Sequence, residues 1–134
     1  MEQIIALDIG ETRTGIAKAD IEGILVKAYK TIPTENIIQE IQEIEKDFEI
    51  KTIVIGLPLN IDGSDNEQSR KIRAEAEKLE QFGNKELVFE DEKLSSGEAV
   101  ERLKARGITI KQDNKSLIDA EAAAIILEQY FGQG

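Results

Sequence analysis

The sequence predicts an α/β fold with three layers, in which helices cover both faces of a mixed five-stranded sheet. Three strand-like segments with short connections open the chain, and helical and strand-like segments alternate after them. Alternation of this kind implies right-handed crossovers and parallel strands, whereas the opening segments suit an antiparallel meander. The chain has 134 residues, 40% of them hydrophobic, and no Gly/Ser-rich linker, so residues 1–134 are expected to form one domain.

Five segments combine apolar residues with flanking turn formers, and each is predicted to be a strand. They cover residues 3–9, 14–20, 24–32, 51–57 and 86–90. Residues 58–66 are rich in Asn, Asp, Gly and Ser and are predicted to be a loop. In an open sheet of this type, ligands bind at the carboxyl ends of the central strands.

Four segments carry apolar residues at helical spacing. They run from Thr34, a candidate N-cap, to about Phe48; over residues 67–82; from a cap at Ser95 or Ser96 to Gly107; and from a cap at Ser116 to about Phe131.

The residue types that are missing exclude several chemistries. The chain has no His and no Cys, which excludes Ser–His and Cys–His nucleophiles, His-ligated zinc, disulfides and iron–sulfur clusters. With 17 Lys+Arg against 27 Asp+Glu, the net charge of −10 argues against a general nucleic-acid binder, because phosphate neutralisation requires cations. Neither a signal-peptide pattern nor a membrane-length apolar stretch is present in the sequence, so we expect a cytoplasmic protein with no membrane contact.

Carboxylates at three positions are candidates for a shared site. Asp8 lies within an apolar strand, Asp91 and Glu92 end a later strand, and Asp119 begins an Ala-rich helix. Each also has a structural interpretation: Asp8 as a turn cap, Asp91 and Glu92 as an exposed acidic loop, and Asp119 as part of a capping box with Ser116. If the carboxylates converge, they form an all-oxygen site suited to Mg²⁺ or Mn²⁺, which can support phosphodiester cleavage.

Basic residues gather in two stretches despite the acidic total. Residues 93–115 contain six Lys or Arg against three Asp or Glu, and a second cluster follows the loop at 58–66. Ordinary charge pairing on helix surfaces is one explanation. The alternative is that these patches bind a phosphate backbone, and the candidate residues are Arg13, Arg70, Arg73, Lys93 and Arg106.

The segment Asp8-Ile9-Gly10-Glu11-Thr12-Arg13-Thr14-Gly15 is the most specific motif in the chain. Glycines after a strand aspartate permit a tight turn and a close backbone approach to a ligand. The motif resembles the first phosphate loop of the actin and sugar-kinase superfamily, whose members enclose ATP between two such lobes. This chain has a single lobe. If this resemblance is the relevant one, the protein is therefore a single-lobed nucleotide-binding protein.

The same motif also resembles the opening of the YqgF/RuvX family, Asp-x-Gly-x-Lys-Arg-x-Gly-x-Ala. Three later segments resemble that family in order, namely Gly56-Leu57-Pro58 with Asp62-Gly63, Asp91-Glu92-Lys93-Leu94-Ser95-Ser96, and Asp119-Ala120 with Ala122-Ala123. The resemblance covers nearly the whole chain. Thr12 stands where the family usually has Lys, and Lys93 where it usually has Arg. Both departures bear on substrate affinity, since Lys lacks the bidentate fork of Arg.

The resemblance implies an RNase H-like fold and a Holliday junction resolvase-like endonuclease, or a nuclease that processes the precursor of 16S ribosomal RNA. It implies that Asp8, Asp119 and one or both of Asp91 and Glu92 bind Mg²⁺ or Mn²⁺ and act in catalysis. The implied partner is branched DNA or precursor ribosomal RNA. The protein itself is expected to act either on the ribosome or free of it, as a monomer or a homodimer. The alternative is a non-catalytic ribosome-assembly or nucleic-acid-binding factor of the same fold.

Overall fold

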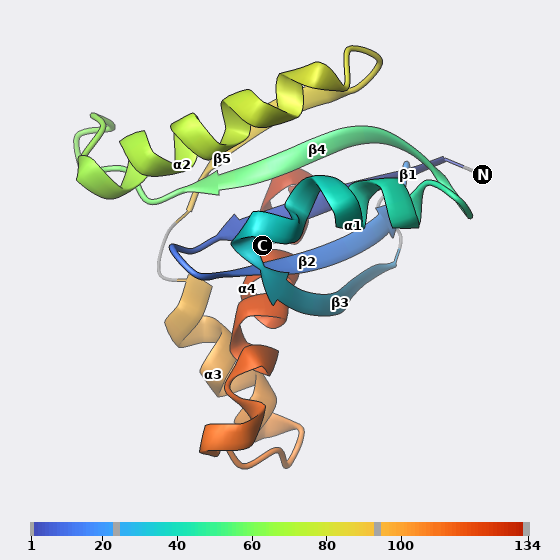
Figure 1. Ribbon diagram of the computed structural model, residues 1–134. Coiled ribbons are helices and arrows are strands. Elements are labelled where there is room, and N and C mark those ends of the chain that lie inside the picture. The colour runs from blue at the N-terminus through green and yellow to red at the C-terminus, as the bar shows by residue number, and fades with distance from the viewer. Residues whose placement is uncertain (1, 23–24, 93–94, 133–134) are drawn as a thin grey trace.

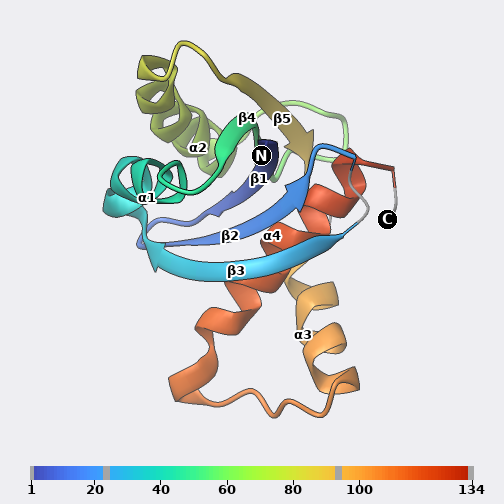
Figure 2. The same cartoon turned by 90° about the vertical axis from the view of Figure 1, so that its right-hand side faces the viewer.

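The computed structural model describes residues 2–22, 25–92 and 95–132, and a twisted five-stranded sheet forms its centre (Figures 1 and 2). The strand order is β3-β2-β1-β4-β5, with β1 antiparallel to β2, β2 antiparallel to β3, and both β4 and β5 parallel to their inner neighbours. The predicted mixed sheet is confirmed. The elements are β1 (Glu2–Ile9), β2 (Arg13–Asp20), β3 (Val26–Pro33), α1 (Ile37–Ile44), β4 (Glu49–Leu57), α2 (Glu67–Glu77), β5 (Glu86–Asp91), α3 (Ser95–Ala105) and α4 (Ser116–Tyr130).

Helices cover both faces of the sheet, as predicted. The helices α1 and α2 lie on one face, α4 crosses the other, and α3 packs against α4 on the side away from the sheet (Figure 2). None of the described helices is long and apolar enough to span a bilayer.

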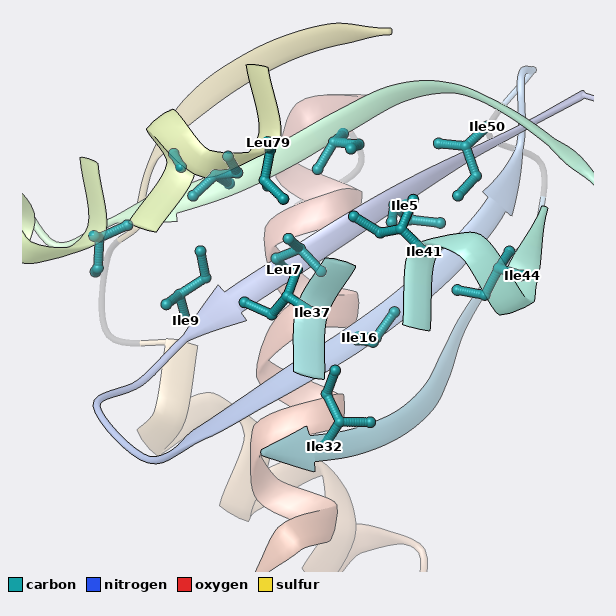
Figure 3. Packing of buried hydrophobic residues seen from close by; sticks show 14 of the residues in the cluster. Ile5, Leu7, Ile9, Ile16, Ile32, Ile37, Ile41, Ile44, Ile50 and Leu79 are labelled. Atoms are coloured by element: carbon teal, nitrogen blue, oxygen red, sulfur yellow. The ribbon is translucent and has the colours of Figure 1, made fainter. Parts of the chain in front are cut away.

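The central strand β1 is buried on both faces because its side chains alternate between two apolar layers. Ile5, Leu7 and Ile9 point into the layer under α1 and α2, where they meet Ile41 of α1 and Leu79 after α2 (Figure 3). This layer is built almost wholly from branched aliphatic residues, which bury a large area and hold α1 and α2 against the sheet.

The opposite layer is made of small side chains. Ile4 and Ala6 of β1 lie there together with Ala17 and Ala19 of β2, and they meet an alanine-rich surface of α4. Small residues on both partners let the helix approach the strands closely. The Ala-rich helix α4 therefore packs closely on the sheet, and this packing determines how near residues of α4 come to residues of β1 and β2.

The first predicted helix has different ends from those expected. The helix α1 stops at Ile44, and a 3₁₀ turn, Thr34–Asn36, precedes it. Thr34 is not its N-cap: the Thr34 hydroxyl donates to the Gly10 carbonyl oxygen at 2.7 Å and accepts from the Thr14 hydroxyl at 2.9 Å. The predicted helix extended to Phe48 because apolar spacing indicates which side chains are buried. Phe48 does pack against the core, but it lies beyond the end of the helix.

Other boundaries differ for similarly local reasons. The start of β3 was predicted at residue 24, which lies outside the described residues, and the strand begins at Val26. The helix α2 ends at Glu77 and continues as a 3₁₀ turn. Ser116 does not cap α4, because a 3₁₀ turn at Gln112–Asn114 leads straight into the helix and no side chain caps it. The cap expected at Ser95 or Ser96 concerns side chains outside the described set.

Candidate active site

Asp8 lies on the α4 side of the central strand. Residues of β1 with even numbers face α4, so Asp8 follows Ile4 and Ala6 toward the small-residue layer, one position before the strand ends. Its partner across the antiparallel pair is Gly15 of β2. The strand does continue through Asp8 to Ile9, so Asp8 is part of the strand and does not cap the following turn.

Gly15 is the point at which the first turn of α4 rests on the sheet. A Cβ atom built on Gly15 would lie 2.7 Å from the backbone nitrogen of Ala120 and would overlap the backbone carbonyl of Asp119. Only glycine therefore permits this approach. Because Gly15 also pairs with Asp8, the contact brings Asp119 next to Asp8.

Glu92 reaches the same region from the other side of β1. Its backbone nitrogen donates to the Leu57 carbonyl oxygen at 2.8 Å, which continues the β4–β5 pairing beyond the end of β5. A Cβ built on Gly56 would lie 3.1 Å from Glu92 Oε2 and 2.5 Å from Ile126 Cδ1. The Glu92 carboxylate therefore lies over Gly56, beside α4.

Asp91 is the one predicted carboxylate that the structure places elsewhere. It alternates with Leu87 and Phe89 along β5, which assigns it to the α2 face of the sheet, and it is exposed. The structure thus brings Asp8, Glu92 and Asp119 together and leaves Asp91 on the opposite face.

Burial and the nearby negative charges change the protonation of Asp8. Burial, followed by the charges of Glu92 and Asp119, raises the pKa of Asp8 to about 8. Burial also raises the pKa of Asp119, against an opposing attraction from Arg13, whose Nε lies 3.0 Å from Asp119 Oδ2. Carboxylates that repel one another in this way favour either a bound proton or a bound cation.

The donor set fits a hard divalent cation. Every candidate ligand is a carboxylate oxygen, which suits Mg²⁺ or Mn²⁺. Asp119 Oδ2 is buried, and no aligned hydrogen bond reaches it from the described residues, so one oxygen of the cluster has unused acceptor capacity. Across residues 2–22, 25–92 and 95–132, no three acidic side chains are close enough to ligate one ion. The carboxylates converge but do not meet at a single point.

The predicted phosphate-binding residues have diverse environments. Arg13 pairs with Asp119, Arg73 Nε lies 2.9 Å from Asp65 Oδ1, and Arg106 Nη2 lies 2.5 Å from Glu121 Oε1. Arg70 is exposed and has no ion pair among the described residues. Lys93 lies outside the described residues. Nucleic-acid binding by this set stays a prediction.

Two glycines of the sequence motifs have a packing role that was not assigned to them from the sequence. Gly15 and Gly56 interrupt otherwise apolar strands, and an isolated glycine in a strand marks a close approach of another backbone or side chain. That signal was available for both positions. The sequence could not reveal which element makes the approach, since α4 lies more than 60 residues further along the chain in both cases.

The sheet carries one carboxylate on its central strand, a second after an outer parallel strand and a third on the helix that crosses it. This strand order and this arrangement are those of RNase H-like proteins. In agreement, the fold is similar to that of Thermus thermophilus RuvC in a complex with a Holliday junction substrate, with a TM-score of 0.53, 12% identity and coverage of 98% of this chain and 97% of that one.

The family follows from the sequence comparisons. The RuvX family, described as Holliday junction resolvase, matches residues 2–133, and the chain belongs to this family. Its relatives include proteins named "Putative pre-16S rRNA nuclease" from Fusobacterium nucleatum, 35% identical over 97% of this chain and 96% of the relative, and from Anaeromyxobacter dehalogenans, 37% identical over 92% of each. The suspected RuvX resemblance and the RNase H-like fold class are confirmed.

Proposed function

We propose that the protein is a divalent-metal-dependent endonuclease that cleaves structured nucleic acid, with branched DNA and the precursor of 16S ribosomal RNA as candidate substrates. Family membership and the names of the relatives support nuclease activity. The observation that carries the assignment of the site is the convergence of Asp8, Glu92 and Asp119, which together with burial raises the pKa of Asp8 to about 8. Transcription and ribosome assembly in bacteria share the cytoplasm, so the proposal includes a cytoplasmic location.

Asp8, Glu92 and Asp119 would hold Mg²⁺ or Mn²⁺. When bound, such ions activate water for attack on the phosphodiester and stabilise the leaving oxygen. Burial, followed by the charges of Glu92 and Asp119, raises the pKa of Asp8 to about 8, so a bound cation would have to displace the proton that this carboxylate otherwise favours. Arg13 keeps Asp119 oriented through Nε, and its two terminal amino groups would be the ones to bind a phosphate beside the cluster.

The test is cleavage of a four-way DNA junction and of a precursor ribosomal RNA fragment, with Mg²⁺, with Mn²⁺ and with EDTA. Asp8→Asn and Glu92→Gln are expected to abolish cleavage. Asp20→Asn, at the opposite end of β2, is the matched control and should cleave like the wild type. Cleavage that survives Asp8→Asn, or that proceeds equally in EDTA, would contradict the proposal.

A non-catalytic ribosome-assembly factor is the second candidate. The observation in its favour is that, among the described residues, no three acidic side chains are close enough to ligate one ion. Such a factor would bind the ribosomal RNA precursor or an assembling small subunit without cleaving it, and Mn²⁺ would not bind at the carboxylate cluster.

A further inference from the structure

The strand β3 forms one edge of the sheet. It has β2 as its single neighbour there, and the end of α3 and the start of α4 project beyond this edge (Figure 2). A groove of about 480 Å³ runs between β3 and these two helices. We call it the β3 groove, and its mostly apolar lining includes Ala28, Thr31, Leu103, Ile108, Leu117 and Ala120.

The backbone of β3 directs hydrogen-bonding groups toward the groove. Thr34 N donates to the Thr12 carbonyl oxygen of the neighbouring chain at 2.9 Å, and bonded positions alternate along an antiparallel ladder. Thr31 precedes Thr34 by three residues, so its N–H and carbonyl groups point away from β2. Its hydroxyl donates to the Ser116 carbonyl oxygen at 2.6 Å, which ties the start of α4 to β3. Across residues 2–22, 25–92 and 95–132, no strand pairs with this side of β3, and an edge of this kind accepts an added extended chain.

The two faces of β3 differ in their chemistry. Ala28 and Thr31 lie on the α4 face, opposite small residues of β2, and line the groove. Lys27 and Lys30 lie on the other face, where Lys30 Nζ is 2.9 Å from Glu40 Oε2 of α1. A strand added at this edge would therefore place alternate side chains in the apolar groove and beside the two lysines.

Positive charge gathers around the β3 groove, although the protein as a whole has a net charge of −10. Lys27, Lys104 and Lys115 are exposed and have no ion pair among the described residues, and the last two each adjoin a lining residue in the chain. The acidic lining residue Glu121 is buried, and its Oε1 lies 2.5 Å from Arg106 Nη2, so its charge is already neutralised. The groove therefore complements an acidic ligand and disfavours a basic one.

A second copy of the chain does not complement this edge. Two β3 strands paired antiparallel about a two-fold axis would bring Lys27 and Lys30 of both copies onto one face, and like charges across a strand pair are destabilising. A nucleic-acid backbone would meet the lysines but not the rest of the site. Phosphate oxygens only accept hydrogen bonds, so the Thr31 carbonyl would have no donor and the apolar lining no partner. An acidic polypeptide in extended conformation matches all three features.

We propose that the β3 groove binds an extended segment of a partner protein in which acidic and apolar residues alternate, and that this segment pairs with β3 as an additional strand. Backbone hydrogen bonds supply affinity, apolar side chains enter the groove beside Leu117, which is 41% exposed, and acidic side chains meet Lys27 on the other face. The segment lies beside the first turn of α4, which carries Asp119. This partner site goes beyond the proposed nuclease function and requires neither metal nor cleavage.

Binding is tested with the full-length protein in EDTA, by fluorescence anisotropy on labelled peptides as long as β3, which has 8 residues. One peptide alternates valine and glutamate, a second alternates valine and lysine, and a third is the glutamate peptide with a central proline, which keeps the charge but lacks an N–H. The variants are Lys27→Glu and Leu117→Asp. Their matched controls are Arg70→Glu and Ile61→Asp, because both positions are exposed and neither lines the groove.

The wild type is expected to bind the glutamate peptide, and the lysine and proline peptides at least about tenfold more weakly. Lys27→Glu should lose affinity for the glutamate peptide and gain affinity for the lysine peptide. Leu117→Asp should bind the glutamate peptide at least about tenfold more weakly, whereas the two controls should change its affinity less than about twofold. Hydrogen exchange at the Thr31 amide should slow when the glutamate peptide binds, since that N–H then has a strand partner.

Absent binding of the glutamate peptide, or equal binding of all three peptides, would overturn the inference, as would wild-type affinity in a folded Lys27→Glu protein. Thermal melting confirms folding of each variant. Two further measurements identify the other occupants. A single-stranded oligonucleotide of equal charge that displaces the glutamate peptide would assign the groove to nucleic acid. A dimer seen in sedimentation equilibrium and lost in Leu117→Asp would assign it to a second copy, and either result rejects the partner segment. Because every measurement is made in EDTA without cleavage, failure of the nuclease proposal leaves this test intact.

Discussion

The backbone of Asp119 rests directly on Gly15, and Gly15 is the strand partner of Asp8. This contact is what brings a carboxylate from the start of α4 to a carboxylate on β1, across more than one hundred residues of sequence. The metal site proposed for this member of the RuvX family therefore depends on a residue that has no functional group of its own.

Substituting Gly15 by alanine tests this dependence. The added methyl group cannot be accommodated without moving α4, so we expect Gly15→Ala to lower the free energy of unfolding by at least about 1–3 kcal/mol, the usual cost of overpacking. Activity should fall more steeply than stability, because the shift separates Asp119 from Asp8. Gly83→Ala is the control, since a Cβ there meets no neighbour and its effect should stay within about 0.5 kcal/mol. Urea unfolding curves provide the measurement. Equal effects of the two substitutions would show that α4 does not depend on Gly15.

Asp8 should make the stability of the metal-free protein depend on pH. Its pKa is raised from 3.8 to about 8, so between these values the folded state binds a proton that the unfolded state has lost. Stability should therefore fall as pH rises from 5 to 8, by no more than about 1.4 kcal/mol per unit from this group. Asp8→Asn mimics the protonated form, and it should reduce the slope and be more stable than the wild type at pH 8. Thermal melting in EDTA checks this, and an unchanged slope in Asp8→Asn would contradict it.

Glu92 and Asp91 should differ in their effect on the cluster. Glu92→Gln removes a charge that raises the pKa of Asp8 and a candidate ligand, so Mn²⁺ binding should weaken by at least tenfold. Asp91→Asn alters an exposed side chain assigned to the other face and should change Mn²⁺ affinity less than about twofold. Calorimetric titration with Mn²⁺ measures both. A larger loss with Asp91→Asn would mean that Asp91 is the ligand.

Charge reversal should separate Arg70 from Arg106. Arg70 has no ion pair among the described residues, so Arg70→Glu should weaken nucleic-acid binding without loss of stability. The salt dependence should also become shallower, by a slope of about 0.9 for each phosphate that is no longer neutralised. Arg106→Glu places a carboxylate beside the buried Glu121 and should destabilise the α3–α4 pair. Anisotropy at several salt concentrations and thermal melting distinguish the two effects. Arg106→Glu with wild-type stability and weaker binding would assign Arg106 to the nucleic-acid surface.

The Thr14–Thr34 pair should contribute to the stability of the turn after Asp8. The Thr34 hydroxyl accepts from Thr14 and donates to the Gly10 carbonyl oxygen, so Thr34→Val leaves two polar groups without their partner. We expect a loss of about 1–3 kcal/mol in the free energy of unfolding. Thr109→Val, at an exposed position, is the control and should have little effect. An equal effect at both positions would indicate that the buried pair adds nothing beyond side-chain volume.

The secondary structure was largely predictable because each element carries its own signal. Apolar runs bounded by turn formers marked β1, β2 and β4, and helical spacing marked α1 and α2, since these patterns reflect which side chains are buried. The ends of elements were less predictable. Thr34 has the residue type and position of an N-cap, but its hydroxyl bonds across to Gly10 and Thr14, contacts that depend on how β1, β2 and β3 lie together.

The candidate site was predictable in its residue types. A chain with no His and no Cys has only oxygen ligands for a metal, and an aspartate inside the apolar run of β1 required a partner. Because side chains alternate along a strand, Asp91 and Glu92 face opposite sides of the sheet, so that at most one of them points toward a shared site.

The sequence by itself determined the class of fold, the family and the residue types available to the candidate site, since these depend on local periodicity and on which residue types are present. Only the tertiary structure decided that Glu92 approaches Asp8, that Arg73 lies over Phe89, and that α4 reaches the sheet at Gly15. Each of these depends on the packing of elements far apart in the chain, and the distances between their side chains are set by the residues that fill the space between the layers.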